Sequence, residues 1–103
     1  MKREPCHILC SDKILTRKVL ICNKRGLHAR ASAKFVKVVS SYDNVRVTVE
    51  KDDIAVGGTS IMGLMILAAS SGSMITIKAS GHEAATVLDA LEKLIHNRFG
   101  EYD

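Results

Sequence analysis

The spacing of apolar residues predicts seven secondary-structure elements after residue 16. Val45, Val47 and Val49 alternate with polar residues, which is the period of a half-buried strand. Three shorter apolar runs rich in β-branched residues predict further strands. Apolar residues recurring every three or four positions predict helices between the strands and after the last one. The expected strands cover residues 17–22, 45–50, 54–56 and 74–79, and the expected helices cover residues 27–41, 60–69 and 84–99.

The order of these elements is βαββαβα, and turn residues separate them. Gly26, Gly57-Gly58 and Gly72 mark three of the breaks. Before the last helix, Ser80 is followed three residues later by Glu83, which is the spacing of a capping box with Ser80 as the N-cap. We expect Gly100 to end that helix.

Composition and pattern together predict an α+β fold in one domain. The chain has 103 residues, of which 47% are hydrophobic, enough for a single core. Strands that are polar on one side pair into an antiparallel sheet with one covered face. We therefore predict an open-faced βαββαβα sandwich, with a four-stranded antiparallel sheet covered on one face by three helices.

The first 16 residues lack sustained periodicity and contain Pro5. We interpret residues 1–16 as a flexible N-terminal extension and residues 17–103 as the domain. The extension has no apolar core of a secretory signal. The longest apolar run of the domain, residues 61–69, is far shorter than the roughly 20 residues of a membrane helix. The sequence therefore predicts a cytoplasmic protein without membrane insertion.

The three cysteines are an odd number and too few for a disulfide framework, so we expect free thiols at Cys6, Cys10 and Cys22. Cys6, His7 and Cys10 offer three possible metal ligands. No fourth ligand follows at zinc-finger spacing, and no metal site is predicted.

The candidate chemistry lies at His28, which directly follows a Gly-Leu turn at the start of the first predicted helix. The unpaired N–H groups and the positive dipole end of a helix N-terminus stabilise a bound anion. The same field favours the neutral imidazole, whose free ring nitrogen is a nucleophile. Arg30 adds a cation that can bind phosphate oxygens. The alternative is a capping histidine without chemistry.

Basic residues continue along one stripe of this helix, from Arg30 to Lys34 and Lys37. Such a stripe is either a solvated face or a docking surface, and its start beside His28 favours docking. The formal net charge of +4 suits an acidic protein partner. It is too small to require nucleic acid.

Two separated motifs carry a family resemblance. The stretch Gly-Leu-His-Ala-Arg from Gly26, followed about thirty residues later by Gly-Gly-Thr-Ser-Ile-Met-Gly-Leu-Met from Gly57, resembles the HPr family of histidine-containing phosphocarriers over residues 17–99. The resemblance implies the same sandwich, with phosphate carried on Nδ1 of His28 and held by backbone N–H groups and Arg30. It implies transfer from phosphorylated Enzyme I to an Enzyme IIA-type domain in the bacterial phosphotransferase system for sugar transport. The protein would be a cytoplasmic relay, a monomer, without cofactor, metal or turnover of a small molecule.

The second motif implies regulation at Ser60. It is similar to the serine site of the kinase-regulated proteobacterial type, which an HPr kinase/phosphorylase phosphorylates. The alternative is a serine that only caps its short helix. The resemblance also implies a docking surface on this helix beside the phosphohistidine. The residues expected to bind partners are Ile61, Met62, Met65, Lys34 and Lys37.

One departure from the family concerns Ala31, where many members have proline. Alanine keeps the helix, so the departure affects the choice between a sugar-transport branch and a nitrogen-related or regulatory branch. Two other functions remain open. A small basic nucleic-acid-binding domain is one, although the strands offer no aromatic residues for base stacking. A regulatory partner protein without phosphotransfer is the other.

Overall fold

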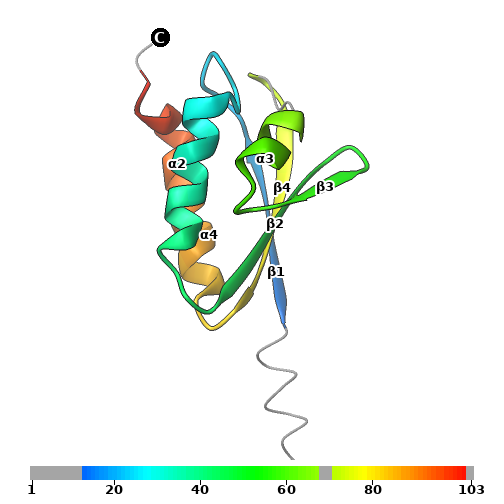
Figure 1. Ribbon diagram of the computed structural model, residues 1–103, viewed down its shortest axis with the longest axis vertical. Coiled ribbons are helices and arrows are strands. Elements are labelled where there is room, and N and C mark those ends of the chain that lie inside the picture. The colour runs from blue at the N-terminus through cyan, green and yellow to red at the C-terminus, as the bar shows by residue number, and fades with distance from the viewer. Residues whose placement is uncertain (1–12, 68–70, 102–103) are drawn as a thin grey trace, which may run out of the picture.

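The computed structural model describes residues 13–67 and 71–101. In this part of the chain, four strands form one antiparallel sheet in the order β1-β4-β2-β3. Three α-helices lie on one face of it, and a short 3-10 helix, η1, follows the last of them (Figure 1). The strands are β1 Ile14–Leu20, β2 Val45–Lys51, β3 Ile54–Gly57 and β4 Met74–Gly81, and the helices are α2 Ala29–Ser40, α3 Ile61–Leu67, α4 Ala84–His96 and η1 Arg98–Gly100.

The core lies between the helices and the covered face of the sheet. Val49, Ile75 and Ile77 of the sheet are fully buried, as are Phe35 of α2 and Leu91 of α4. The neighbours of these strand residues are polar or exposed, which confirms the expected alternation and the open-faced α+β sandwich. Among the described residues, no helix is both long and apolar enough to cross a bilayer.

The first strand begins earlier than expected. β1 starts at Ile14, so it includes three residues that the sequence placed in the extension. They pair with the end of β4, where Ile14 lies opposite Ser80. The predictions for Pro5, Cys6, His7 and Cys10 concern residues outside the described part of the chain, as does the expected helical turn over residues 68–70.

The predicted capping box before α4 is wrong. Ser80 is a strand residue that pairs with Ile14 on one side and Arg46 on the other. The N-cap of α4 is Glu83, which makes no side-chain capping hydrogen bond. Because β4 extends to Gly81, its last residues pair with β1 on one side and with β2 on the other. These backbone pairings form in place of the local capping hydrogen bonds. The spacing alone could not show this, because the competing partners lie more than thirty residues away in sequence.

The last helix also ends earlier than expected, at His96 rather than at Gly100. Arg98, Phe99 and Gly100 have φ of 56°, 55° and 76°, so the chain turns sharply through three left-handed residues. The first two are not glycine, and this conformation is costly for them. The fully buried Phe99 side chain anchors the turn.

We expect Gly81→Ala to destabilise the fold by more than about 2 kcal/mol. Gly81 has a φ of +113°, and a Cβ built there would lie 1.9 Å from the carbonyl oxygen of Asn44. Gly57→Ala is the matched control, because a Cβ at that position has no atom within 4 Å. Urea unfolding of the three proteins measures the difference. Equal losses of stability in both variants would show that the close approach to Asn44 does not matter.

Candidate functional site

His28 is the N-cap residue of α2. Its backbone is extended, with φ −80° and ψ −175°, and its carbonyl accepts the N–H of Ser32 at 2.8 Å. Its Nδ1 accepts the backbone N–H of Arg30 at 3.2 Å. His28 therefore caps the helix, as one interpretation of the sequence expected. The same cap directs Nδ1 toward the N–H groups of the helix start, where an anion can bind, and the side chain remains 23% exposed.

The other ring nitrogen contacts a residue that the sequence did not indicate. His28 Nε2 hydrogen-bonds to Oε2 of Glu101, whose side chain is only 10% exposed. The second carboxylate oxygen of Glu101 accepts Nδ2 of the buried Asn23 at 3.0 Å. Asn23 Nδ2 also donates to the carbonyl of Gly26 at 3.0 Å, which ties the carboxylate to the turn before His28.

These contacts determine the protonation of the neutral ring. A carboxylate only accepts hydrogen bonds, so Nε2 carries the proton that Glu101 binds. Nδ1 then holds the lone pair that accepts the Arg30 N–H. This tautomer leaves Nδ1 as the nucleophilic nitrogen of His28.

The environment keeps Glu101 ionised. Burial raises the pKa of its carboxyl group, but the hydrogen bonds from Asn23 and His28, together with the positive charge of Arg25, outweigh burial and hold the pKa below its usual value of 4.5. A fixed negative charge therefore lies beside Nε2. It can balance positive charge that develops on the ring when Nδ1 is modified.

The left-handed turn after α4 brings Glu101 to the site. Lys34 Nζ donates to the carbonyl of Phe99 at 2.5 Å, which holds the turn against α2. No periodicity or spacing reports such a contact, because Glu101 and His28 are 73 residues apart. The local signal in this segment is Gly100, which predicts only the end of a helix.

The basic stripe of α2 divides into two kinds of residue. Lys34 is half-buried, and its ammonium donates a hydrogen bond to the carbonyl of Phe99. Arg30 and Lys37 are exposed. In the part of the chain that the structure describes, the Arg30 guanidinium makes no hydrogen bond or ion pair, so it can bind an anion near His28. Ala31 is fully buried in the first turn, and α2 forms without proline there.

Ser60 directly precedes α3, and its Oγ accepts the backbone N–H of Gly63 at 2.9 Å. The capping role expected of a serine at this position is thus present. Ser60 is also exposed, so its hydroxyl is accessible.

The exposed face of α3 is apolar. Ile61, Met62 and Met65 are 40%, 72% and 43% exposed, while Leu64 and Leu67 face the core. Ile66, which the sequence did not indicate, is 67% exposed and extends the same face. Figure 1 shows α3 beside the half of α2 that begins after His28, and the two helices pack together. We call these four exposed residues of α3 the apolar patch.

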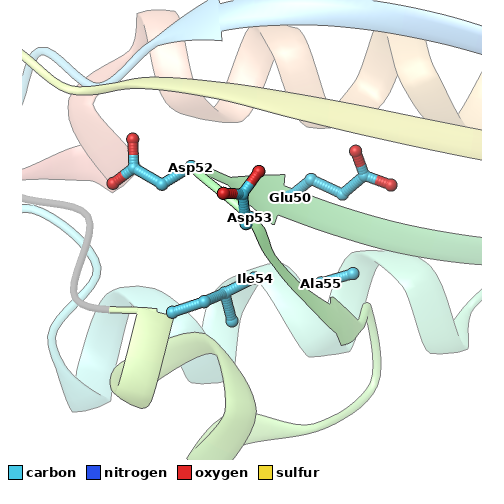
Figure 2. A pocket seen from close by; sticks show the side chains of 5 residues that line it. All are labelled: Glu50, Asp52, Asp53, Ile54 and Ala55. Atoms are coloured by element: carbon cyan, nitrogen blue, oxygen red, sulfur yellow. The ribbon is translucent and has the colours of Figure 1, made fainter.

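A hollow lies at the β2–β3 hairpin and has a volume of about 230 Å³. Figure 2 shows its lining residues, among which the carboxylates of Glu50 and Asp52 lie at opposite ends. Within residues 13–67 and 71–101, no group of acidic, histidine or cysteine side chains is arranged to hold a metal ion. This hollow is therefore not a candidate metal centre.

Comparison with known proteins identifies close relatives. Residues 15–97 match the family model described as the PTS HPr component phosphorylation site. The phosphocarrier protein HPr of Neisseria meningitidis serogroup A is 46% identical over 88 residues, which cover 85% of this chain and 98% of the relative.

Solved structures agree with the sequence relatives. The crystal structure of HPr-C-His from Thermoanaerobacter tengcongensis superposes with a TM-score of 0.81 at 38% identity, covering 86% of this chain and 99% of that chain. A crystal structure of an HPr dimer from the same organism has a TM-score of 0.67 at 41% identity, covering 81% and 94%.

Proposed function

The chain belongs to the HPr family of phosphocarrier proteins of the phosphotransferase system, and we propose that it accepts a phosphoryl group on Nδ1 of His28. The donor in this proposal is phosphorylated Enzyme I, and the acceptor is an Enzyme IIA-type domain. The observation that carries the proposal is the pair of contacts on His28: Glu101 binds Nε2, and Nδ1 faces the start of α2. The protein would work as a cytoplasmic relay without a cofactor.

The transfer is an in-line displacement at phosphorus. The Nδ1 lone pair forms the new P–N bond while the bond from phosphorus to the donor residue breaks, and the donor residue keeps that electron pair. The ring retains its Nε2 proton and becomes positively charged. The Glu101 carboxylate, already bonded to that proton, stabilises this charge without rearrangement.

The phosphate oxygens would be held by groups already at the helix start. The Arg30 N–H, which points at Nδ1 in the free protein, lies beside the position of the new P–N bond. The exposed guanidinium of Arg30 can reach the same oxygens. The positive helix start interacts more favourably with the phosphorylated ring, which carries a dianion, than with the unmodified neutral ring. This difference favours phosphorylation of His28.

The direct test of the proposal is phosphorylation with phosphoenolpyruvate and Enzyme I. The expected result is one phosphoryl group that survives alkaline conditions and is located on His28 by mass spectrometry. Phosphate found on another residue, or no phosphate, would contradict the proposal. Adding an Enzyme IIA-type domain should then remove the phosphate from His28.

We further propose that the apolar patch binds the donor and acceptor proteins and that phosphorylation of Ser60 by an HPr kinase/phosphorylase weakens this binding. Ser60 is exposed and adjoins the patch. A phosphate there adds about two negative charges beside a surface that binds acidic partners.

Ser60→Asp is expected to lower the apparent affinity for Enzyme I about tenfold, with a smaller deficit at high salt, which screens repulsion. Stability should stay within about 1 kcal/mol of the parent, because aspartate is also a good N-cap for Gly63. Thr86→Asp is the control, since Thr86 is exposed in the first turn of α4, outside the patch. An equal loss of affinity in both variants, or in neither, would contradict a regulatory role for Ser60.

Glu101→Gln should slow transfer to His28 about tenfold, because glutamine has one acceptor oxygen for two donors, Nε2–H of His28 and Nδ2–H of Asn23, and cannot balance the charge on the ring. The variant should also lose a pH dependence of stability. The pKa of Glu101 is lowered in the folded protein, so its stabilising contribution is present above pH 4.5 and disappears as the pH falls through the lowered value.

Rates from rapid quenching and urea unfolding between neutral and acidic pH measure both effects. Asp53→Asn is the control, because Asp53 is an exposed carboxylate at the β2–β3 hairpin. A variant of Glu101 that transfers phosphate at the parent's rate would show that the carboxylate only orders the ring.

We propose that the carrier acts as a monomer, because each chain contains every residue of the His28 site. The T. tengcongensis relative has been crystallised as a dimer, so a dimer is the alternative that the measurement tests. Sedimentation equilibrium at micromolar concentration should give the mass of one chain.

A further inference from the structure

The face of the sheet opposite the helices carries a compact group of hydrogen-bond donors. Arg46 of β2 lies opposite Ser80 of β4, and Thr48 lies opposite Lys78. All four point away from the core, because the residues between them, Val47 and Ala79, are buried under the helices. The four side chains form a two-by-two block in which the two cations occupy one diagonal and the two hydroxyls the other. We call this group the donor block.

The donor block surrounds a hollow of about 100 Å³. Ile14 of β1, which is 61% exposed, and Ala79 complete its lining. No carboxylate lines the hollow. Every charged or hydroxyl group around it can donate a hydrogen bond, so its electrostatic character suits an anion.

The two cations remain able to bind a ligand. Arg46 makes no hydrogen bond or ion pair with any residue in the described part of the chain. Lys78 Nζ lies 3.0 Å from Oε2 of Glu50, which is one row farther along β2 and outside the hollow. An ammonium has three donors, so this ion pair leaves Lys78 able to contact a second anion.

We propose that the donor block binds the phosphate group of a small phosphorylated molecule. A tetrahedral phosphate presents several oxygens, which donors on four sides can contact together, whereas a planar carboxylate presents two. The guanidinium and the ammonium provide opposite charge for the dianion. The exposed Ile14 at the rim offers an apolar contact for the carbon part of a phosphate monoester, a contact that free phosphate cannot use.

This site is separate from His28, which lies at the start of a helix on the other face of the sheet. A molecule bound at the donor block would leave the apolar patch and the His28 site uncovered. Binding at the donor block does not require phosphotransfer, because the proposed relay uses none of its residues.

Titration with n-propyl phosphate, a phosphate monoester with an apolar carbon part, followed by amide chemical shifts, tests the proposal. Saturable shifts are expected at Thr48, Lys78 and Ser80, and they should persist in His28→Ala, which removes the other anion-binding position. Arg46→Gln should weaken this binding about fivefold through loss of a charge-assisted hydrogen bond. Glu50→Gln should strengthen it, because the ammonium of Lys78 is then free of its competitor. Lys18→Gln, on the same face but outside the hollow, is the control.

Inorganic phosphate forms the second arm of the titration. Tighter binding of the monoester than of free phosphate supports the contact with Ile14. Equal or weaker binding of the monoester would overturn that contact and show that free phosphate is a sufficient ligand. Shifts confined to His28 and Arg30, or an affinity that Arg46→Gln and Lys18→Gln change equally, would overturn the site itself. The unchanged spectrum of each variant without ligand verifies that it is folded.

Discussion

His28→Ala should abolish phosphorylation by Enzyme I and phosphoenolpyruvate, with transfer reduced by at least about a thousandfold. The variant loses the nucleophile, and no second histidine can replace it among the described residues: His82 is an exposed residue before α4, and His96 lies near Glu92, 4.0 Å away, at the far end of that helix. Alkali-stable, acid-labile phosphate is the quantity to measure. His82→Ala is the matched control and should be labelled like the parent.

The variant should remain folded. His28 provides one capping acceptor for α2 and a partner for Glu101, and loss of a cap costs about 1 kcal/mol. Cooperative urea unfolding with an unchanged slope would verify this. Undiminished labelling of His28→Ala would show that the phosphoryl group is carried elsewhere, and the proposed function would then be wrong.

The parts of the fold that the sequence predicted are those with regular periodicity. Alternation in residues 45–50 and the three-to-four spacing in α2 and α4 each require one face of the element to be buried, so the pattern identified both the element and its buried face. Ser80 shows the limit of such reasoning. Its local spacing fitted a capping box, but pairing with both Ile14 and Arg46 determined its conformation.

The candidate site divides in the same way. His28 and Arg30 could be found because a helix start is a local feature and because the Gly-Leu-His-Ala-Arg motif favours a functional histidine over a capping one. Glu101 could not, since its approach depends on three consecutive left-handed residues and on Phe99 filling the core. Lys34 was expected in the docking surface because it shares a stripe with Arg30, but its contact with the Phe99 carbonyl is a tertiary one. The exposure of Ile66 likewise depends on how α3 packs on the sheet.

Arg30→Ala should slow phosphoryl transfer to His28 about a hundredfold while leaving binding of Enzyme I largely unchanged. In the free protein the Arg30 guanidinium has no partner among the described residues, so its removal breaks no native contact of the side chain. The positive charge of the guanidinium stabilises the oxygens of the phosphoryl group in the transition state, when that group leaves the donor and lies near the start of α2. An interaction made mainly in the transition state lowers the rate at saturating donor rather than the affinity.

Two further variants separate charge, hydrogen-bond geometry and docking. Arg30→Lys keeps the charge but loses the bidentate fork, so it should recover only part of the rate. Lys37→Ala removes an exposed cation from the same stripe of α2, two turns from His28, and should weaken association with Enzyme I without slowing transfer at saturation. Rapid-quench measurements at saturating phosphorylated Enzyme I give the transfer rate directly. If Arg30→Ala matched the parent under these conditions, the backbone N–H groups at the start of α2 would suffice to hold the phosphate, and Arg30 would act only in docking.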